Sequence, residues 1–156
     1  MCIFKQILED EEIVNLYAKI YKLEDEWGNW AHHGLDHVLN VTKLVEVLLS
    51  KFGYDNEFIE EAKVAALLHD VGVTEGKEGH ALRSYNYVKD YFKRKNIKLK
   101  NEELVLDAIK IHSDGFDTEN IIALTLILSD KLDIKYTRMA KAGYDVPGMR
   151  QISSKL

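Results

Sequence analysis

The sequence has very little cysteine and proline, with one residue of each among 156. The lone cysteine, Cys2, cannot form a disulfide within the chain, which is typical of a reducing compartment, so we expect a cytoplasmic protein. Long hydrophobic runs are also missing, since the longest, Ile121–Leu128, spans eight residues with a threonine among them and a membrane helix needs about 18. The segment after Met1 turns acidic by Glu9 and lacks the apolar core of a signal peptide. These features predict no association with a membrane.

Basic residues are fewer than acidic residues. The chain has 21 lysines and arginines against 26 aspartates and glutamates, a formal net charge of −5. This balance argues against a protein that binds duplex nucleic acid, which requires a broad basic surface. Residues 131–156 differ, with six basic and two acidic side chains, and such a local field still allows the chain to bind a phosphate-bearing small molecule. The charge therefore predicts no nucleic-acid duplex as partner.

Apolar residues recur at helical spacing along most of the chain, and no segment alternates as a half-buried strand would. The length favours one domain spanning residues 1–156. Residues 62–68 are apolar almost all round, which predicts a helix in the centre of the core, and Asn101 is expected to cap a later helix. The fold class expected is all-α, a compact bundle of about six helices. Their expected ranges are 11–26, 35–52, 56–69, 80–95, 102–112, and from Asp117 or Thr118 to about Lys141.

The six histidines carry most of the functional information. Four predicted helices each place a histidine or aspartate on the inward face, and a fifth opens with a histidine. Any one of them alone is more often an ordinary core or surface residue. Together, uncompensated polar groups in a small core would each cost on the order of several kcal/mol, and a metal site removes this cost because imidazoles and carboxylates bind Fe, Mn, Zn or Co. The residues are His37, His69, Asp70, His80, His112 and Asp130.

Three short stretches carry a family pattern: His33-Gly34-Leu35-Asp36-His37-Val38, Ala65-Ala66-Leu67-Leu68-His69-Asp70-Val71-Gly72 and Leu128-Ser129-Asp130-Lys131. In these stretches the sequence resembles the HD-domain superfamily of metal-dependent phosphohydrolases, over about residues 30–135. His80 and His112 stand where members with two metals have two further histidines. Val73 departs from the pattern, because many such members have lysine there, so that phosphate contact is expected to be missing or moved to Lys77.

The resemblance implies a centre of two divalent ions, of Fe, Mn, Co, Zn or Mg, with Asp70 bridging them. The first ion would be held by His37, His69, Asp70 and Asp130, and the second by Asp70, His80 and His112. The implied reaction is hydrolysis of a phosphoester or phosphoanhydride of a nucleotide or another small phosphorylated molecule, by a metal-activated hydroxide.

Besides Asp70, two side chains are catalytic candidates. His33 is four residues before His37, so on a continuous helix it would lie one turn away on the metal-facing side. There it would protonate the leaving group, and a hydrogen bond that supports a ligand is an equal interpretation. Lys131 follows Asp130 and points about 100° away on a helix, toward the substrate or toward solvent. Weaker candidates for phosphate contacts are Lys77, Arg83 and Lys110.

Two other functions stay open at this point. A di-iron oxygenase would use the same ligands on the same bundle, and dioxygen-dependent turnover would identify it. A metal-binding regulatory module without turnover would keep the fold, although the complete set of ligand positions argues against it. The sequence also leaves open a homo-oligomer and a natural chain that continues past Leu156.

Overall fold

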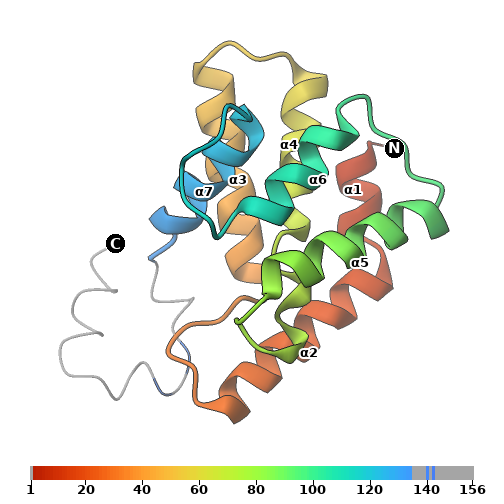
Figure 1. Cartoon of the computed structure of the whole chain (residues 1–156). Helices are drawn as coiled ribbons and strands as arrows, with labels where there is room; N and C mark the ends of the chain where they lie inside the picture. Colours follow the sequence, from red (N-terminus) through yellow and green to blue (C-terminus); the bar gives the residue numbers. More distant parts are fainter. Residues whose placement is uncertain (1, 135–139, 141, 143–156) are drawn as a thin grey trace.

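The computed structural model of this chain describes residues 2–134, 140 and 142. Within them lie seven α-helices, one 3-10 helix and no strand, so the all-α prediction is confirmed (Figure 1). In chain order the elements are α1 (Ile3–Leu8), α2 (Glu11–Trp27), α3 (Leu35–Lys51), α4 (Asn56–Leu68), the 3-10 helix η1 (Val71–Glu75), α5 (His80–Arg94), α6 (Glu102–Ile111) and α7 (Ile121–Leu132).

The predicted helices match α2 to α6 within a residue at each end, but the last predicted helix begins too early and does not continue past Leu132. α7 begins at Ile121 because the Asn120 side chain accepts hydrogen bonds from the backbone N–H groups of Ile122 and Ala123. It ends at Leu132, since Asp133 leaves the helical conformation with a ψ of 85°. The predicted end near Lys141 lies outside the described residues. The prediction also lacked α1 and η1.

Helix α4 lies in the middle of the bundle and contacts α1, α3, α6 and α7 (Figure 1). Its second half is fully buried from Val64 to Leu68, as the almost continuous apolar sequence predicts. The Asp55 side chain caps its start by accepting a hydrogen bond from the Phe58 backbone N–H. His69 and Asp70, the polar pair that follows Leu68, therefore lie in the centre of the molecule.

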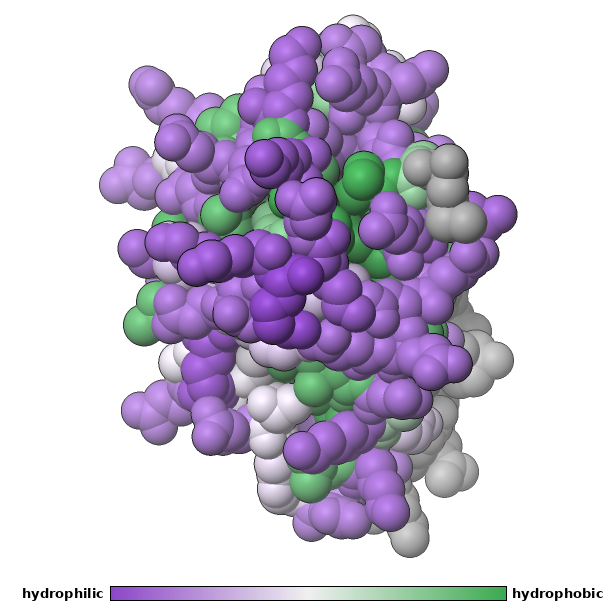
Figure 2. Space-filling model, turned by 90° about the vertical axis from the view of Figure 1, so that its right-hand side faces the viewer, coloured by the Kyte–Doolittle hydropathy of each residue, from purple (hydrophilic) through white to green (hydrophobic). Residues whose placement is uncertain are grey.

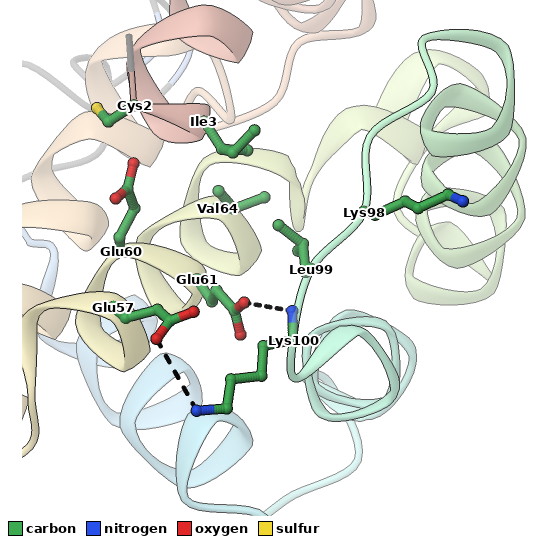
Figure 3. A pocket seen from close by; sticks show the side chains of 9 residues that line it. All are labelled: Cys2, Ile3, Glu57, Glu60, Glu61, Val64, Lys98, Leu99 and Lys100. Carbon is green, nitrogen blue, oxygen red and sulfur yellow. Dashed lines mark hydrogen bonds and ion pairs between the residues drawn. The ribbon is translucent and has the colours of Figure 1, made fainter.

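A buried carboxylate on α4 fixes where α6 begins. Glu61 accepts hydrogen bonds from the backbone N–H groups of Lys100 (2.6 Å) and Asn101 (2.9 Å), and Figure 3 shows the first of these together with the ion pair between Lys100 and Glu57. Asn101 does precede α6, but its side chain makes no capping bond, because its amide donates to Glu61 instead (2.9 Å). These bonds join the start of α6 to α4, and the C-terminal end of α6 then lies near His69 and Asp70.

Hydrophilic residues cover most of the face seen in Figure 2, where hydrophobic residues appear only in small patches. This is the surface expected when amphipathic helices turn their apolar sides inward. None of the described helices is long and apolar enough to cross a membrane.

Candidate metal centre

Asp70 stands at the junction between α4 and η1, and its side chain is almost completely buried. Its two carboxylate oxygens face different partners. Oδ2 lies 3.2 Å from Nε2 of His37 and 3.2 Å from Nε2 of His69. Oδ1 lies 3.3 Å from Nε2 of His80 and 3.5 Å from Nε2 of His112. One carboxylate therefore joins two groups of histidines.

The first group contains His37, His69, Asp70 and Asp130, with one ligand atom from each within 4.8 Å of the others. His37 comes from the first turn of α3 and His69 from the C-terminal cap of α4. Asp130 comes from the last turn of α7, and its Oδ1 lies 2.9 Å from Nε2 of His37 and 3.7 Å from Nε2 of His69. Three helices far apart in sequence thus supply one cluster.

The second group contains Asp70, His80 and His112. His80 is the first residue of α5 and His112 is the C-terminal cap of α6. Their Nε2 atoms are 2.9 Å apart, and both rings are buried. The structure therefore brings together all six residues predicted as metal ligands, in the two groups that the resemblance implied.

Backbone carbonyls fix the orientation of three of these rings. Nδ1 of His69 lies 2.7 Å from the carbonyl oxygen of Ala66. In the same way, Nδ1 of His80 lies 2.7 Å from the carbonyl oxygen of Lys77, and Nδ1 of His112 lies 2.7 Å from that of Ile109. A carbonyl only accepts hydrogen bonds, so each Nδ1 carries the proton, and each Nε2 of a neutral ring presents a lone pair.

The donor set fits a metal for that reason. Two Nε2 lone pairs that face each other at 2.9 Å repel one another unless a cation or a proton lies between them. Donor atoms bound to an ion at about 2.0–2.2 Å stand about 3 Å from one another, close to the separations in both groups. The buried Nε2 atoms of His37 and His69 and Oδ2 of Asp70 also have no hydrogen bond of good geometry within the described residues.

The ring of His37 is held by a residue that the sequence analysis missed. Nδ1 of His37 donates to Oδ2 of Asp133 at 2.7 Å, and Asp133 is buried just after α7. The side chain of Asn40 lies 3.4 Å from the other oxygen of Asp133. Asp133 follows Asp130 by three residues, one helical turn, and this spacing was the signal that could have identified it.

The cluster strongly favours positive charge. Burial lowers the pKa of His37, but Asp130, Asp133 and Asp70 outweigh it and raise the pKa to about 9. Burial likewise opposes the protonation of His69, yet Asp70 and Asp130 raise its pKa to about 10. Burial raises the pKa of the Asp70 carboxyl, and the surrounding histidines reverse this and hold it well below its usual range. A cation between these groups replaces the protons that they otherwise retain.

His33 does not lie on a helix, so the condition under which it would lie one helical turn from His37 is not met. α3 begins only at Leu35, with Gly34 at its N-cap, and His33 precedes it. The His33 ring still meets the His37 ring edge to face, with 5.5 Å between centroids. Its Nδ1 lies 2.6 Å from Oε2 of Glu24, whose Oε1 accepts the His33 backbone N–H at 2.6 Å.

Glu24 is completely buried and was also missed. It occupies the inward stripe of α2 four residues after Ile20, so helical spacing marked it as a core position. Burial raises the pKa of its carboxyl, but the hydrogen bonds and charge of His33 outweigh this and lower it. Glu24 is therefore an ionised carboxylate that orients His33.

A cavity of about 170 Å³ forms the mouth of the cluster. Lys131 lies at its edge, exposed, with Nζ 6.0 Å from the centroid of the Phe116 ring. Val73 is fully buried, whereas Lys77 reaches the mouth. The residues that line the mouth are His33, Asp70, Lys77, His80, His112, Ser113, Asp130 and Lys131.

Two of the weaker phosphate candidates lie elsewhere. Arg83 donates to the carbonyl oxygens of Gly72, Gly76 and Glu78, so it holds the turn before α5. Nζ of Lys110 lies over the Tyr85 ring, 5.2 Å from its centroid and away from the mouth.

Comparison with known proteins agrees with this geometry. A family model described as HD domain matches residues 34–138. Ribonuclease Y 1 of Pediococcus pentosaceus is 27% identical over 124 residues, which are 78% of this chain and 21% of that protein. The chain thus spans about a fifth of the length of this curated relative. No solved structure matches.

Proposed function

Because this chain belongs to the HD domain family, a superfamily of metal-dependent phosphohydrolases, we propose that it hydrolyses a phosphoester or phosphoanhydride of a small phosphorylated molecule at a centre of two divalent ions. Membership of the family supports the class of reaction. The number of ions and the size of the substrate are the parts proposed here.

One observation carries the two-ion proposal. The two oxygens of Asp70 face two separate pairs of imidazole nitrogens, His37 with His69 and His80 with His112. A site for one ion needs only the first pair together with Asp130. The second pair, with both Nδ1 atoms bound to carbonyls, has no other role among the described residues that explains its facing lone pairs.

The chain's own residues divide the remaining work. When bound, the two ions supply an activated water and polarise a phosphoryl oxygen. His37, His69, Asp70 and Asp130 would hold one ion, and Asp70, His80 and His112 the other.

His33 and the two lysines at the mouth act on the substrate. As the oxygen of water bonds to phosphorus and the bond to the leaving oxygen breaks, His33 donates a proton to that leaving oxygen. Since Nδ1 is engaged with Glu24, Nε2 is the donating atom. Lys77 and Lys131, at the edge of the mouth, attract the phosphoryl oxygens that carry the negative charge.

The test is metal analysis followed by a substrate panel. Protein stripped with chelator is reloaded without oxygen with Mn, Fe, Co, Zn or Mg and assayed on aryl phosphates, nucleotides and a short oligoribonucleotide. The oligoribonucleotide is included because the similar protein is named a ribonuclease. We expect two ions per chain and turnover of a nucleotide.

Three results would contradict the proposal. The first is a wild-type protein that turns over no phosphorylated compound with any metal. The second is a preference for the oligoribonucleotide over every small substrate. The third is turnover that requires dioxygen, which would identify the oxygenase alternative.

A further inference from the structure

Helix α2 supplies none of the residues in the two ligand groups, yet its inward side reaches the metal centre at two points. The buried residues of α2 are Ile13, Tyr17, Ile20 and Glu24, which form one stripe at helical spacing. Glu24, near the end of the helix, holds His33. Tyr17 lies two turns earlier on the same stripe and contacts the end of α4.

The hydroxyl of Tyr17 binds the turn that leads into Asp70. It donates a hydrogen bond to the carbonyl oxygen of Leu67 at 2.5 Å, from a position 50 residues earlier in the chain. Because α4 ends at Leu68, the carbonyl groups of its last turn lack partners within the helix. The His69 ring binds one of them, that of Ala66, and Tyr17 binds the next. Side chains therefore complete the end of α4.

The same hydroxyl also interacts with Asp70. Tyr17 is completely buried, and burial raises the pKa of its hydroxyl well above the ordinary value. The charge of the Asp70 carboxylate raises this pKa further, whereas a hydrogen bond with the Asp70 backbone opposes the shift. The hydroxyl therefore keeps its proton, and it contacts the backbone at Leu67 and at Asp70, on either side of His69.

The segment after Asp70 is held in a similar way by α5. The backbone N–H of Gly72 donates to Oγ of Ser84 at 2.9 Å, and Ser84 is fully buried. A buried polar group that loses its partner is costly, so the chain on both sides of Asp70 resists displacement. A fixed position matters at Asp70, because its carboxylate belongs to both ligand groups.

We propose that Tyr17 is a positioning residue of the metal centre, whose hydroxyl holds the end of α4 so that Asp70 reaches both ligand groups at once. Tyr17 does not belong to either group and does not line the mouth, so its effect passes through Asp70. The inference rests on the proposed centre of two ions. Metal binding tests it whether or not the chain is a hydrolase.

The metal test compares Tyr17→Phe with two matched variants of the full chain. Tyr17→Phe keeps the ring that fills the core and removes only the hydroxyl. Tyr91→Phe is the control for the loss of a hydroxyl, because Tyr91 is only 1% exposed and donates to Oδ2 of Asp10 at 2.7 Å, outside the ligand groups. Ile13→Val is the control for weaker packing on the same stripe of α2.

Competition between the Zn²⁺-loaded protein and a chelator, with elemental analysis, measures how tightly each variant holds its ions. The temperature is one at which circular dichroism shows every variant folded. We expect Tyr17→Phe to weaken the binding of both ions about 10–100-fold, the usual effect of losing a group that orients a ligand. Tyr91→Phe and Ile13→Val should change it less than about twofold, as expected for distant sites, even where their melting temperatures fall as far.

The kinetic test uses p-nitrophenyl phosphate at a series of metal concentrations. We expect Tyr17→Phe to raise the metal concentration for half-maximal activity about 10–100-fold. KM for the substrate should stay within about twofold of the wild type, because Tyr17 does not line the mouth. A variant that is only less stable would lose activity at every metal concentration, so this comparison separates positioning from folding.

The inference and the proposed function fail in different ways. If the wild type hydrolyses no phosphorylated compound but Tyr17→Phe alone weakens the binding of both ions, the phosphohydrolase function is wrong and the role of Tyr17 stands. If Tyr17→Phe holds both ions as tightly as Tyr91→Phe, or if Ile13→Val weakens them equally, Tyr17 is an ordinary core residue and the inference is overturned. Weakening of one ion only would also overturn it, because Asp70 belongs to both groups.

Discussion

The pair formed by His33 and Glu24 allows the proton transfer to be tested separately from metal binding. We expect His33→Ala to slow turnover of a substrate with a poor leaving group about 10²–10⁴-fold, the usual contribution of a general acid. Metal content should stay at the wild-type level because His33 is not among the ligand groups. The loss should shrink for an activated aryl phosphate, whose leaving group needs no proton. Steady-state kinetics on both substrates, with metal analysis, provides the measurement.

Glu24→Gln tests whether Glu24 acts on the reaction through His33. If it does, the double variant with both Glu24→Gln and His33→Ala should be no slower than His33→Ala alone. Equal losses on both substrates would leave His33 a positioning role only. A loss of metal from His33→Ala would make it a ligand or a support for one.

The two ligand groups predict different metal contents for single substitutions. Asp70→Ala removes one donor from each group, so we expect the protein to lose both ions and all turnover. His80→Ala removes a donor from the second group only, so one ion should remain. His32→Ala is the control, because His32 is also buried but pairs with Asp25 and stacks on Tyr21. Elemental analysis after anaerobic loading measures all three.

A wild-type content near one ion per chain, unchanged in His80→Ala, would rule out the second site. Full turnover in Asp70→Ala would exclude its bridging role.

The ligands were predicted from the sequence, whereas their supporting residues were missed. His37, His69 and Asp130 stood out as polar residues on apolar stripes, and the family resemblance grouped them. Glu24 was hidden in the acidic run Glu24-Asp25-Glu26, which reads as a solvated helix end. Helical spacing after Ile20 places the first of these three carboxylates on the inward side of α2, but only the fold shows that it reaches His33.

Among the glycines of the described residues, Gly72 has the least room for a side chain, because η1 packs closely against α5 there. A Cβ at Gly72 would lie 2.5 Å from the His80 carbonyl oxygen and 2.5 Å from the Ser84 backbone nitrogen. Gly72→Ala should therefore push η1 and α5 apart, lower the free energy of unfolding by about 1–3 kcal/mol, and weaken binding of the ion that His80 helps to hold. Thermal denaturation and metal retention during dialysis test this.

Gly53→Ala is the comparison for that variant. Gly53 has a φ of 82° and open space around its Cβ position, so alanine there costs about 1 kcal/mol through backbone strain alone. It should lower the melting temperature without releasing metal. Equal metal retention in the two variants would show that the η1–α5 contact does not position His80.

Helices with long apolar stripes could be predicted from the sequence, and short or interrupted ones could not. α1 has only six residues, too few to be stable without tertiary contacts, and it is held partly by the hydrogen bond from the Phe4 backbone N–H to Glu60. The early end of α7 depends on Asp133, which reaches a ring 96 residues away in sequence. Local patterns contain neither contact.

For the whole molecule, the histidine pKa values predict how stability depends on pH when metal is removed. The folded-state pKa values of about 9 for His37 and about 10 for His69 exceed the ordinary histidine pKa of 6.5. Their contribution to stability is therefore complete below about pH 6.5 and is lost as the pH rises through 9 to 10. The melting temperature of chelator-treated protein should fall across this window.

Metal-loaded protein should not follow that fall, because the ion rather than a proton then occupies the cluster. Melting curves from pH 6 to pH 10, with EDTA and with Zn²⁺ or Mn²⁺, compare the two forms. A metal-free melting temperature that is constant or rises over this range would contradict the assignment.

The cluster gathers side chains from α3, α4, α5, α6 and α7, in a chain whose only cysteine is Cys2. Bound ions would thus act as removable cross-links between helices that no disulfide joins. Protease resistance should then behave as a switch: a chelator would expose the ends of these helices to cleavage together, and restored metal would protect them together, much as reduction and reoxidation do for a disulfide-bonded protein.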